Sequence, residues 1–345
     1  MIRLESDYLE GAHPLIIEHL TETNMEQTPG YGTDAHCKNA SNLIRSACYA
    51  PEADVHFLVG GTQTNAVVIT SVLRPHQGVI CAETGHINVH ETGAIEARGH
   101  KVLPLPSQDG KLSAAAVRAC YDAHYSDNDR EHIVQPGMVY IPHPTENGTT
   151  YTAKELEELS CLCRELSLPL YLDGARLSYG LAAPVNDLSL EMIARLCDIF
   201  YIGGTKTGAL FGEALVITSP SLKKDFRYLI KQQGAMLAKG RLLGIQFETL
   251  FTDELYIQIA RHAVNLAMDI KKTFQEKGIA LYYDSCTNQQ FPVLNKQQIK
   301  VLAETYSFSH WKDLPDDKTV IRLCTSWATD PEYVRQLCRD IREKL

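Results

Sequence analysis

The sequence lacks any apolar run that approaches the roughly 20 residues needed for a membrane-spanning helix. Its first residues, 1–10, interleave charged and apolar side chains, so they lack the continuous apolar core of a secretory signal peptide. Internal repeats and low-complexity linkers are also missing. We therefore expect a protein that has no membrane partner.

Positive charge is scarce relative to negative charge. The 345 residues include 33 lysines and arginines against 42 aspartates and glutamates, which gives a net charge of −9. The basic residues are dispersed rather than grouped, so the sequence indicates no surface for nucleic acid or anionic lipid. A small molecule is the expected partner.

Closely paired cysteines are absent as well. Ten cysteines are scattered along the chain, and the nearest two, Cys161 and Cys163, are separated by a single residue. This spacing excludes a Cys-x-x-Cys metal or redox motif. We predict reduced, mostly buried thiols and a cytoplasmic location.

The composition, 44% hydrophobic and 22% charged, is ordinary for a globular protein of two domains. From residue 54 to residue 216, short β-rich runs alternate with helical segments. This pattern predicts an α/β fold with a mostly parallel, mixed sheet covered by helices. We place this large domain at residues 30–250 and a smaller α+β domain at residues 1–29 together with 251–345. The strands predicted for the large domain span residues 55–59, 79–82, 101–105, 138–141, 170–172, 198–202 and 214–218.

Two helix starts are well marked. Thr152 and Glu155 have the spacing of a capping box, and Asp330-Pro331 combines a capping carboxylate with a proline in the first turn. Further predicted elements are helices near 237–250 and 253–277 and weaker strands near 279–283 and 319–324.

Two residues that follow apolar strand runs suggest a cofactor. Lys206 follows Tyr201-Ile202-Gly203-Gly204-Thr205, and Asp173 follows Tyr171-Leu172. A lysine can form a Schiff base, and a carboxylate can hold a protonated ring nitrogen; these are the protein's contributions to pyridoxal phosphate chemistry. Ligands of open α/β sheets collect at this end of the strands. The alternatives are a surface lysine in a Gly-Thr turn and an aspartate that caps a turn, with Arg176 as its ionic partner.

A glycine turn supplies a candidate phosphate site. Gly60-Gly61-Thr62-Gln63 lies between a predicted strand and a predicted helix, where free backbone amides bind phosphate and the Thr62 and Gln63 side chains can add hydrogen bonds. The Thr205-Lys206 pair is not a Walker A loop, because its upstream glycine is misplaced.

His86 follows the next strand, where a flat imidazole can lie over a cofactor ring or move a proton. His90, four residues later, and the adjacent Glu91 leave a metal site as an alternative, but no third ligand is identifiable and we predict no metal. A structural histidine is the other alternative.

Two arginines are candidates for gripping a substrate carboxylate, because a planar guanidinium can meet a carboxylate with two parallel hydrogen bonds. Arg176 follows the Asp173 segment, and Arg322 lies within the apolar run Val320-Ile321-Arg322-Leu323-Cys324. An exposed edge strand is the alternative for Arg322.

Together these residues resemble the threonine aldolase group of the β-eliminating lyase family, which has the aspartate aminotransferase-like fold. The resemblance covers most of the chain, and its most specific element is Asp173-Gly174-Ala175-Arg176-Leu177. The other matching elements are Arg3-Leu4-Glu5-Ser6-Asp7, Tyr31-Gly32-Thr33-Asp34, Gly61-Thr62, His86 and Gly204-Thr205-Lys206.

The resemblance implies a role for each matching position. Lys206 would hold the cofactor, Asp173 would contact its nitrogen, and His86 would stack on its ring. The further residues implied are Gly61, Thr62, Gln63, Thr205 and Arg176 for the cofactor, and Ser6, Tyr31, Arg176 and Arg322 for the substrate. A homodimer or homotetramer with sites at subunit interfaces is also implied, with Tyr31 supplied by a neighbouring chain.

Two positions depart from the family pattern. Glu146 replaces a histidine that approaches the β-hydroxyl in better known members, so substrate and stereochemical preference stay open. Met236 is followed by Leu237 in place of the usual arginine, which leaves one expected basic contact unfilled.

The predicted reaction cleaves the Cα–Cβ bond of a β-hydroxy-α-amino acid, so that threonine or allo-threonine gives glycine and acetaldehyde. His86, or a water that it positions, is the predicted base. Because the sequence does not fix which bond breaks, β-elimination and amino transfer on another amino acid remain alternatives. A non-catalytic binding or scaffolding protein with the same fold is a third.

Overall fold

The large domain is built on one seven-stranded sheet. In the computed structural model, which describes residues 1–345, the strands lie in the order β2-β8-β7-β6-β5-β3-β4. Neighbours from β7 to β4 run parallel, whereas β8 is antiparallel to both β7 and β2. The sheet is therefore mostly parallel and mixed, and all seven predicted strands are confirmed. Their bounds are β2 (Asp54–Leu58), β3 (Gln77–Ala82), β4 (Lys101–Leu105), β5 (Gln135–Pro142), β6 (Leu170–Asp173), β7 (Ile199–Gly203) and β8 (Glu213–Ile217).

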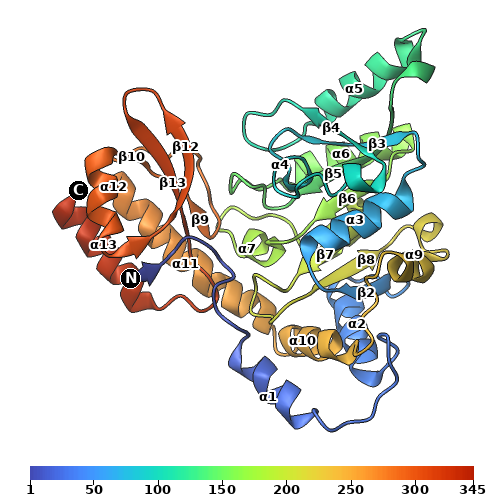
Figure 1. Ribbon diagram of the computed structural model, residues 1–345, viewed down its shortest axis with the longest axis horizontal. Coiled ribbons are helices and arrows are strands. Elements are labelled where there is room, and N and C mark those ends of the chain that lie inside the picture. Colours follow the sequence, from blue (N-terminus) through green and yellow to red (C-terminus); the bar gives the residue numbers. More distant parts are fainter.

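Helices cover both faces of this sheet because its strands are apolar on both sides (Figure 1). Along β7, Phe200 and Ile202 pack into one core, and Ile199 and Tyr201 pack into the core on the opposite face. The first face is covered by α2 (Ala35–Ala47), α5 (Ala114–Ser126), α6 (Ala153–Leu166), α8 (Leu190–Leu196) and α10 (Arg241–Phe251). The second face is covered by α3 (Gly61–Val72) and α9 (Phe226–Gln232).

A smaller set of strands forms a separate unit with the last helices (Figure 1). β13 (Lys318–Cys324) lies between β10 (Val293–Asn295) and β12 (Ser309–Leu314) and also pairs with β9 (Gln289–Gln290). At the N-terminus, β1 (Ile2–Arg3) pairs in parallel with β11 (Tyr306–Ser307), so the N-terminal segment joins this unit. The helices of this unit are α11 (Leu255–Glu276), α12 (Lys296–Ala303) and α13 (Pro331–Lys344).

The local signals in the sequence have the structural roles expected of them. Thr152 and Glu155 form the capping box of α6, and the Asp330 carboxylate accepts a hydrogen bond from the amide of Glu332 at the start of α13. The predicted strand at 279–283 is wrong, because Leu281 makes only an isolated bridge with Pro292. Its apolar pattern arises from packing, since Leu281 lies against the core of the small unit.

The division of the chain into two domains stays a prediction. β1 forms a two-stranded sheet with β11 of the small unit, whereas α1 (Pro14–Glu22) lies against α10, with His19 Nδ1 2.8 Å from Thr249 Oγ1. None of the helices combines the length and the apolarity required to cross a bilayer.

Candidate active site

Two adjoining cavities lie at the carboxyl ends of the large-domain strands. The strand-end cavity, of about 310 Å³, is lined by Asp173, Thr62 and Thr205 among others. The interdomain cavity, of about 530 Å³, has Arg176 and Glu146 from the large domain on its wall, together with residues 309–311 and Arg322 from the small sheet. Three side chains line both cavities: Tyr8, His86 and Lys206. Lys206 therefore lies where the two cavities meet.

Lys206 follows β7, and its backbone is fixed by Tyr179, whose hydroxyl donates to the Lys206 carbonyl at 2.5 Å. The preceding glycines serve close backbone packing. A Cβ at Gly203 would lie 2.5 Å from the Ala175 carbonyl oxygen, and one at Gly204 would lie 2.8 Å from the Gly212 carbonyl oxygen. Larger residues would push apart the strand ends that place Lys206.

Asp173 is the last residue of β6 and shares the strand-end cavity with Lys206. Its Oδ1 accepts from the Tyr201 hydroxyl and from the Ala175 amide, the latter at 3.0 Å. Its Oδ2 accepts from the Tyr140 hydroxyl at 2.6 Å and from the Asn65 amide at 3.0 Å. The carboxylate thus does cap the following turn, but the alternative ion pair with Arg176 does not form.

The glycine turn opens α3 at the edge of the same cavity. Gly60, Gly61 and Thr62 line the cavity, and the first amides of a helix have no partners within it. Gln63 does not line it, because its side-chain oxygen accepts from the Val59 amide at 3.2 Å. This closes the turn rather than extending a donor into the cavity.

Glu213 opens β8 beside Lys206 and was not foreseen from the sequence. Its two oxygens accept from the Thr205 hydroxyl at 2.9 Å and from the Gly204 amide at 3.1 Å. Burial raises the pKa of Glu213 to about 8, although the Thr205 hydrogen bond and the Lys206 charge oppose the rise. The Thr205 hydroxyl is held between this carboxyl group and the Gly212 amide, which donates to it at 3.0 Å.

His86 begins the short helix α4 (His86–Val89), and Glu91 holds its ring. Nδ1 lies 2.8 Å from Oε1 of Glu91, whose side chain is fully buried. Burial alone would lower the pKa of His86, but the Glu91 hydrogen bond and the charges of Glu146 and Asp173 raise it above its usual value. The rings of His86 and His90 have centroids 5.6 Å apart, and no group of three potential metal ligands forms here.

Arg176 is held in place by Asp7. Its Nε and Nη2 donate to the two oxygens of Asp7 at 2.7 and 3.1 Å, and both side chains are buried. Burial would raise the pKa of the Asp7 carboxyl, but the charges of Arg176 and Lys206 hold it well below its usual range. A Glu146 oxygen lies 3.6 Å from Arg176 Nη1. Arg176 therefore reaches the interdomain cavity with its charge largely balanced.

Arg322 has no carboxylate partner. Its guanidinium donates to Oε1 of Gln289 at 3.3 Å and to the Glu5 carbonyl at 3.2 Å, and it lies 5.5 Å from the ring centroid of Trp311. Its Nε is buried without a partner, as is the hydroxyl of Ser6. The edge-strand alternative is wrong, because β13 is the central strand of its sheet. An uncompensated guanidinium and a free hydroxyl suit an anionic group of a ligand.

Tyr31 lies outside both cavities of its own chain. The residue is 45% exposed, and the Lys231 ammonium lies over its ring, 4.4 Å from the ring centroid. Tyr31 instead borders a separate cavity of about 50 Å³ beside His56 and Arg227.

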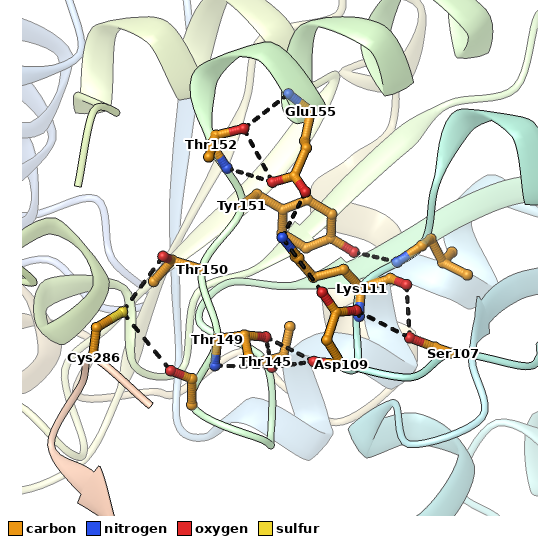
Figure 2. Close-up of polar contacts among 12 residues, drawn as sticks. Ser107, Asp109, Lys111, Thr145, Thr149, Thr150, Tyr151, Thr152, Glu155 and Cys286 are labelled. Carbon is orange, nitrogen blue, oxygen red and sulfur yellow. Dashed lines mark hydrogen bonds and ion pairs between the residues drawn. The ribbon is translucent and has the colours of Figure 1, made fainter. Parts of the chain in front are cut away.

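Glu146 lies in a loop that contacts both domains, and its neighbours Thr145 and Thr149 are hydrogen-bonded to each other (Figure 2). The hydroxyls of Thr145 and Thr149 are 2.6 Å apart, and Thr149 also donates to the Asp109 carbonyl at 2.8 Å. On the small-domain side, the Cys286 amide donates to the Gly148 carbonyl at 3.3 Å. Burial would raise the pKa of Glu146, but the nearby cations, Arg176 first, lower it. Glu146 is thus an ionised side chain on a fixed support.

Asp7, Tyr8 and Glu91 were not predicted as site residues: Asp7 was identified only as the end of the Arg3–Asp7 element, and Glu91 only as part of a possible metal site. Tyrosines at equivalent ends of successive strands, 140, 171 and 201, were a readable signal, because buried hydroxyls need an acceptor. Tyr140 and Tyr201 donate to Asp173, and Tyr171 donates to Asn65 beside it.

Comparison with known proteins agrees with this geometry. The sequence profile described as "Beta-eliminating lyase" matches residues 4–297. A low-specificity L-threonine aldolase of Pseudomonas aeruginosa is 31% identical over 98% of this chain and 96% of its own length. A structure of Leishmania major threonine aldolase is 45% identical, covers 99% of both chains and has a TM-score of 0.96.

A more distant structure shows how widely the fold is shared. A probable N-succinyldiaminopimelate aminotransferase from Thermus thermophilus has a TM-score of 0.74 at 14% identity, and the alignment covers 100% of this chain and 95% of the other. The fold is therefore the aspartate aminotransferase-like fold. The profile match over most of the chain and the near full-length identity with the Pseudomonas relative show that this chain belongs to the β-eliminating lyase family.

Proposed function

We propose that this protein is a pyridoxal phosphate-dependent aldolase that cleaves the Cα–Cβ bond of β-hydroxy-α-amino acids, giving glycine and an aldehyde. The observation that carries the proposal is the position of Lys206. On one side of Lys206 is the strand-end cavity, which contains the Asp173 carboxylate and the start of α3. On the other side is the interdomain cavity, which contains the uncompensated Arg322. Threonine aldolases among its relatives support the choice of reaction.

The residues of the strand-end cavity fit the proposed cofactor. Lys206 would supply the amine, Asp173 would face the ring nitrogen, and His86 would lie against the ring. Gly61, Thr62 and Thr205 line the same cavity and would hold the phosphate. When bound, pyridoxal phosphate supplies an electron-accepting ring that takes up the electron pair of the breaking bond.

The substrate carboxylate would be bound on the interdomain side. Arg322 offers an uncompensated guanidinium, which contacts the carbonyl of Glu5. The next residue, Ser6, has a hydroxyl without a partner. Arg176, fixed by Asp7, lines the same cavity and would contribute guanidinium hydrogen-bond donors. Two arginines and a hydroxyl would orient the amino acid so that its α-amino group meets Lys206.

His86 is the proposed proton acceptor, directly or through a water. Glu91 occupies Nδ1, so Nε2 is the nitrogen that remains for the substrate. The β-hydroxyl proton would pass to Nε2, and the electron pair of the O–H bond would become the second bond of the aldehyde carbonyl. A raised pKa strengthens the imidazole as a base once it has lost its own proton.

The direct test is aldehyde release from L-threonine, L-allo-threonine and phenylserine by protein loaded with pyridoxal phosphate. We expect aldehyde and glycine in equal amounts, and no release from Lys206→Ala. Ammonia with a keto acid instead would support elimination or amino transfer. A protein that binds the cofactor but turns over none of these substrates would refute the proposed reaction.

We also propose that the protein acts as a homodimer or homotetramer in the cytoplasm. Tyr8, at both cavities, is 56% exposed in the single chain, and Tyr31 is exposed on a different surface, which suits completion of each site by a neighbour. All ten cysteines are free, which suits a reducing compartment. Sedimentation equilibrium would show a monomer if the oligomer proposal is wrong.

A further inference from the structure

We infer that Asn65 is a positioning residue that joins the two carboxylates of the site, Glu91 and Asp173, into one rigid unit. The inference rests on the proposed function in so far as His86 and Asp173 are taken to contact the cofactor. Asn65 itself lines neither cavity. It lies in α3 and is 1% exposed.

One nitrogen makes the connection. Nδ2 of Asn65 donates to Oε1 of Glu91 at 2.7 Å and to Oδ2 of Asp173 at 3.0 Å. The two carboxylate oxygens can therefore lie no further apart than the sum of these distances. Two buried negative charges this close repel each other strongly unless donors lie between them. The two hydrogens of one amide, each directed at a different carboxylate, meet this need.

Tyr171 fixes the direction of the amide. Its hydroxyl donates to Oδ1 of Asn65 at 2.6 Å, and the tyrosine ring is fully buried. Ionised carboxylates only accept hydrogen bonds, so the NH₂ group must face them and the carbonyl oxygen must face the hydroxyl. All three polar contacts of Asn65 are thus specified, and a flipped amide would break each of them.

The bridge links groups expected on different parts of the cofactor. Oε1 of Glu91 receives both Asn65 and Nδ1 of His86, so the amide fixes the carboxylate that orients the imidazole. Oδ2 of Asp173 receives both Asn65 and the Tyr140 hydroxyl. Removal of the bridge should therefore disturb the imidazole and the carboxylate together, although Asn65 touches neither cofactor nor substrate.

The test compares Asn65→Leu with Asn65→Ala. Leucine keeps nearly the volume of asparagine but has no amide, so it separates the bridge from packing. We measure the dissociation constant of pyridoxal phosphate from the apoprotein, the visible absorbance band of the bound cofactor, and kcat and KM for aldehyde release. A hydrogen bond to a charged group contributes enough that both variants should bind the cofactor about 10-fold to 100-fold more weakly. The band should shift, and kcat should fall more than KM rises.

Two further variants keep the test decisive. Tyr171→Phe leaves Asn65 in place but frees its amide, and a smaller loss of affinity, about threefold to tenfold, is expected. If the Asn65 variants do not fold, the cofactor affinity of Tyr171→Phe tests the role of Asn65. Asn186→Leu removes a half-buried amide that donates to the Leu181 and Leu188 carbonyls, and it should leave cofactor binding unchanged.

Different experimental results would refute the proposed function and the proposed role of Asn65. Wild-type protein that does not bind pyridoxal phosphate would refute the proposed function. If the wild-type protein binds the cofactor, and Asn65→Leu and Tyr171→Phe match it in affinity and absorbance, only the role of Asn65 is refuted. Recovery of wild-type behaviour in Asn65→Leu but not in Asn65→Ala would also refute it, because volume and not the bridge would then matter.

Discussion

At the scale of single residues, His86 enters the site with one ring nitrogen already committed. Glu91 accepts from Nδ1 and, with Glu146 and Asp173, raises the imidazole pKa against the opposing effect of burial. A base with a raised pKa must lose its own proton before it can act, so activity should rise with pH through this pKa.

The first prediction concerns this pH dependence. Glu91→Gln removes a negative charge at 2.8 Å, so the pKa of His86 should fall and the acidic limb of the kcat/KM profile should move to lower pH by about one unit. The measurement is kcat/KM for threonine across the pH range. The amide of glutamine keeps the volume of the site, and an acidic limb that stays where it is would show that His86 is not the titrating base.

Glu146 is the single carboxylate on the wall of the interdomain cavity, which also carries six cationic or imidazole groups. The cationic and imidazole groups are Arg176, Lys206, Arg322, His86, His90 and His310. An ionised Glu146 should repel a substrate whose β-substituent carries its own carboxylate.

We therefore predict that Glu146→Gln increases the preference for β-hydroxyaspartate over threonine by about tenfold, because a like-charge contact is removed. The ratio of glyoxylate release to acetaldehyde release, each as kcat/KM, measures this. The rate with threonine serves as the internal control for general damage. An unchanged ratio would show that Glu146 does not face the β-substituent.

At the scale of elements, the loop that carries Glu146 depends on one glycine. Gly148 has a φ of +73°, in the left-handed region, and a Cβ there would overlap the Ser285 side chain of the small domain. Gly278, after α11, has nearly the same φ, +72°, but nothing lies within 4 Å of the site of its Cβ. Both positions have a left-handed backbone, but only a side chain at position 148 would meet a neighbouring residue.

Gly148→Ala should thus be more destabilising than Gly278→Ala. Left-handed backbone costs a non-glycine residue roughly 1–2 kcal/mol, which both variants share. Gly148→Ala should lower the Tm further and raise KM, because the loop must move away from Ser285 and carries Glu146 with it. Equal Tm values with wild-type KM in both would contradict a role for this contact.

The elements also show what can be inferred from sequence. The five inner strands of the large sheet were predictable because burial on both faces leaves continuous apolar runs, whereas the edge strands β2 and β4 are only partly buried. The run at 279–283 looked similar, but Leu281 is buried without belonging to a strand. Asp173 ends β6 and Lys206 follows β7, so topology alone brings them to one cavity. Asn65 could not be predicted, because its partners Glu91, Tyr171 and Asp173 come from other segments of the chain.

At the scale of the whole molecule, Asp7 joins three distant parts of the chain. It pairs with Arg176 of the large domain and accepts from Nδ2 of Asn288, beside β9 of the small unit, at 2.9 Å. The buried carboxylate thus holds the N-terminal segment between the two domains.

Asp7→Asn should leave the Arg176 charge without its partner in a buried position and reduce the free energy of unfolding by about 3–5 kcal/mol. The pKa of Asp7 is lowered in the folded protein, so its stabilisation is present at neutral pH and is lost as the pH falls below the ordinary value of 3.8. Denaturant unfolding at pH 7 and at pH 3 measures both effects. If the free energies of unfolding of wild type and variant differ as much at pH 3 as at pH 7, the stabilisation by Asp7 is not ionic.

The position of Trp311 gives the protein a built-in optical probe. The chain has only two tryptophans, and Trp311 lines the interdomain cavity against Arg322, whereas Trp327 lies beside His13. Ligands that enter the cavity change the surroundings of one indole and leave the other untouched. Replacement of Trp327 by phenylalanine would therefore yield a protein whose tryptophan fluorescence comes from the cavity wall alone, so that binding of an amino acid can be followed without any label.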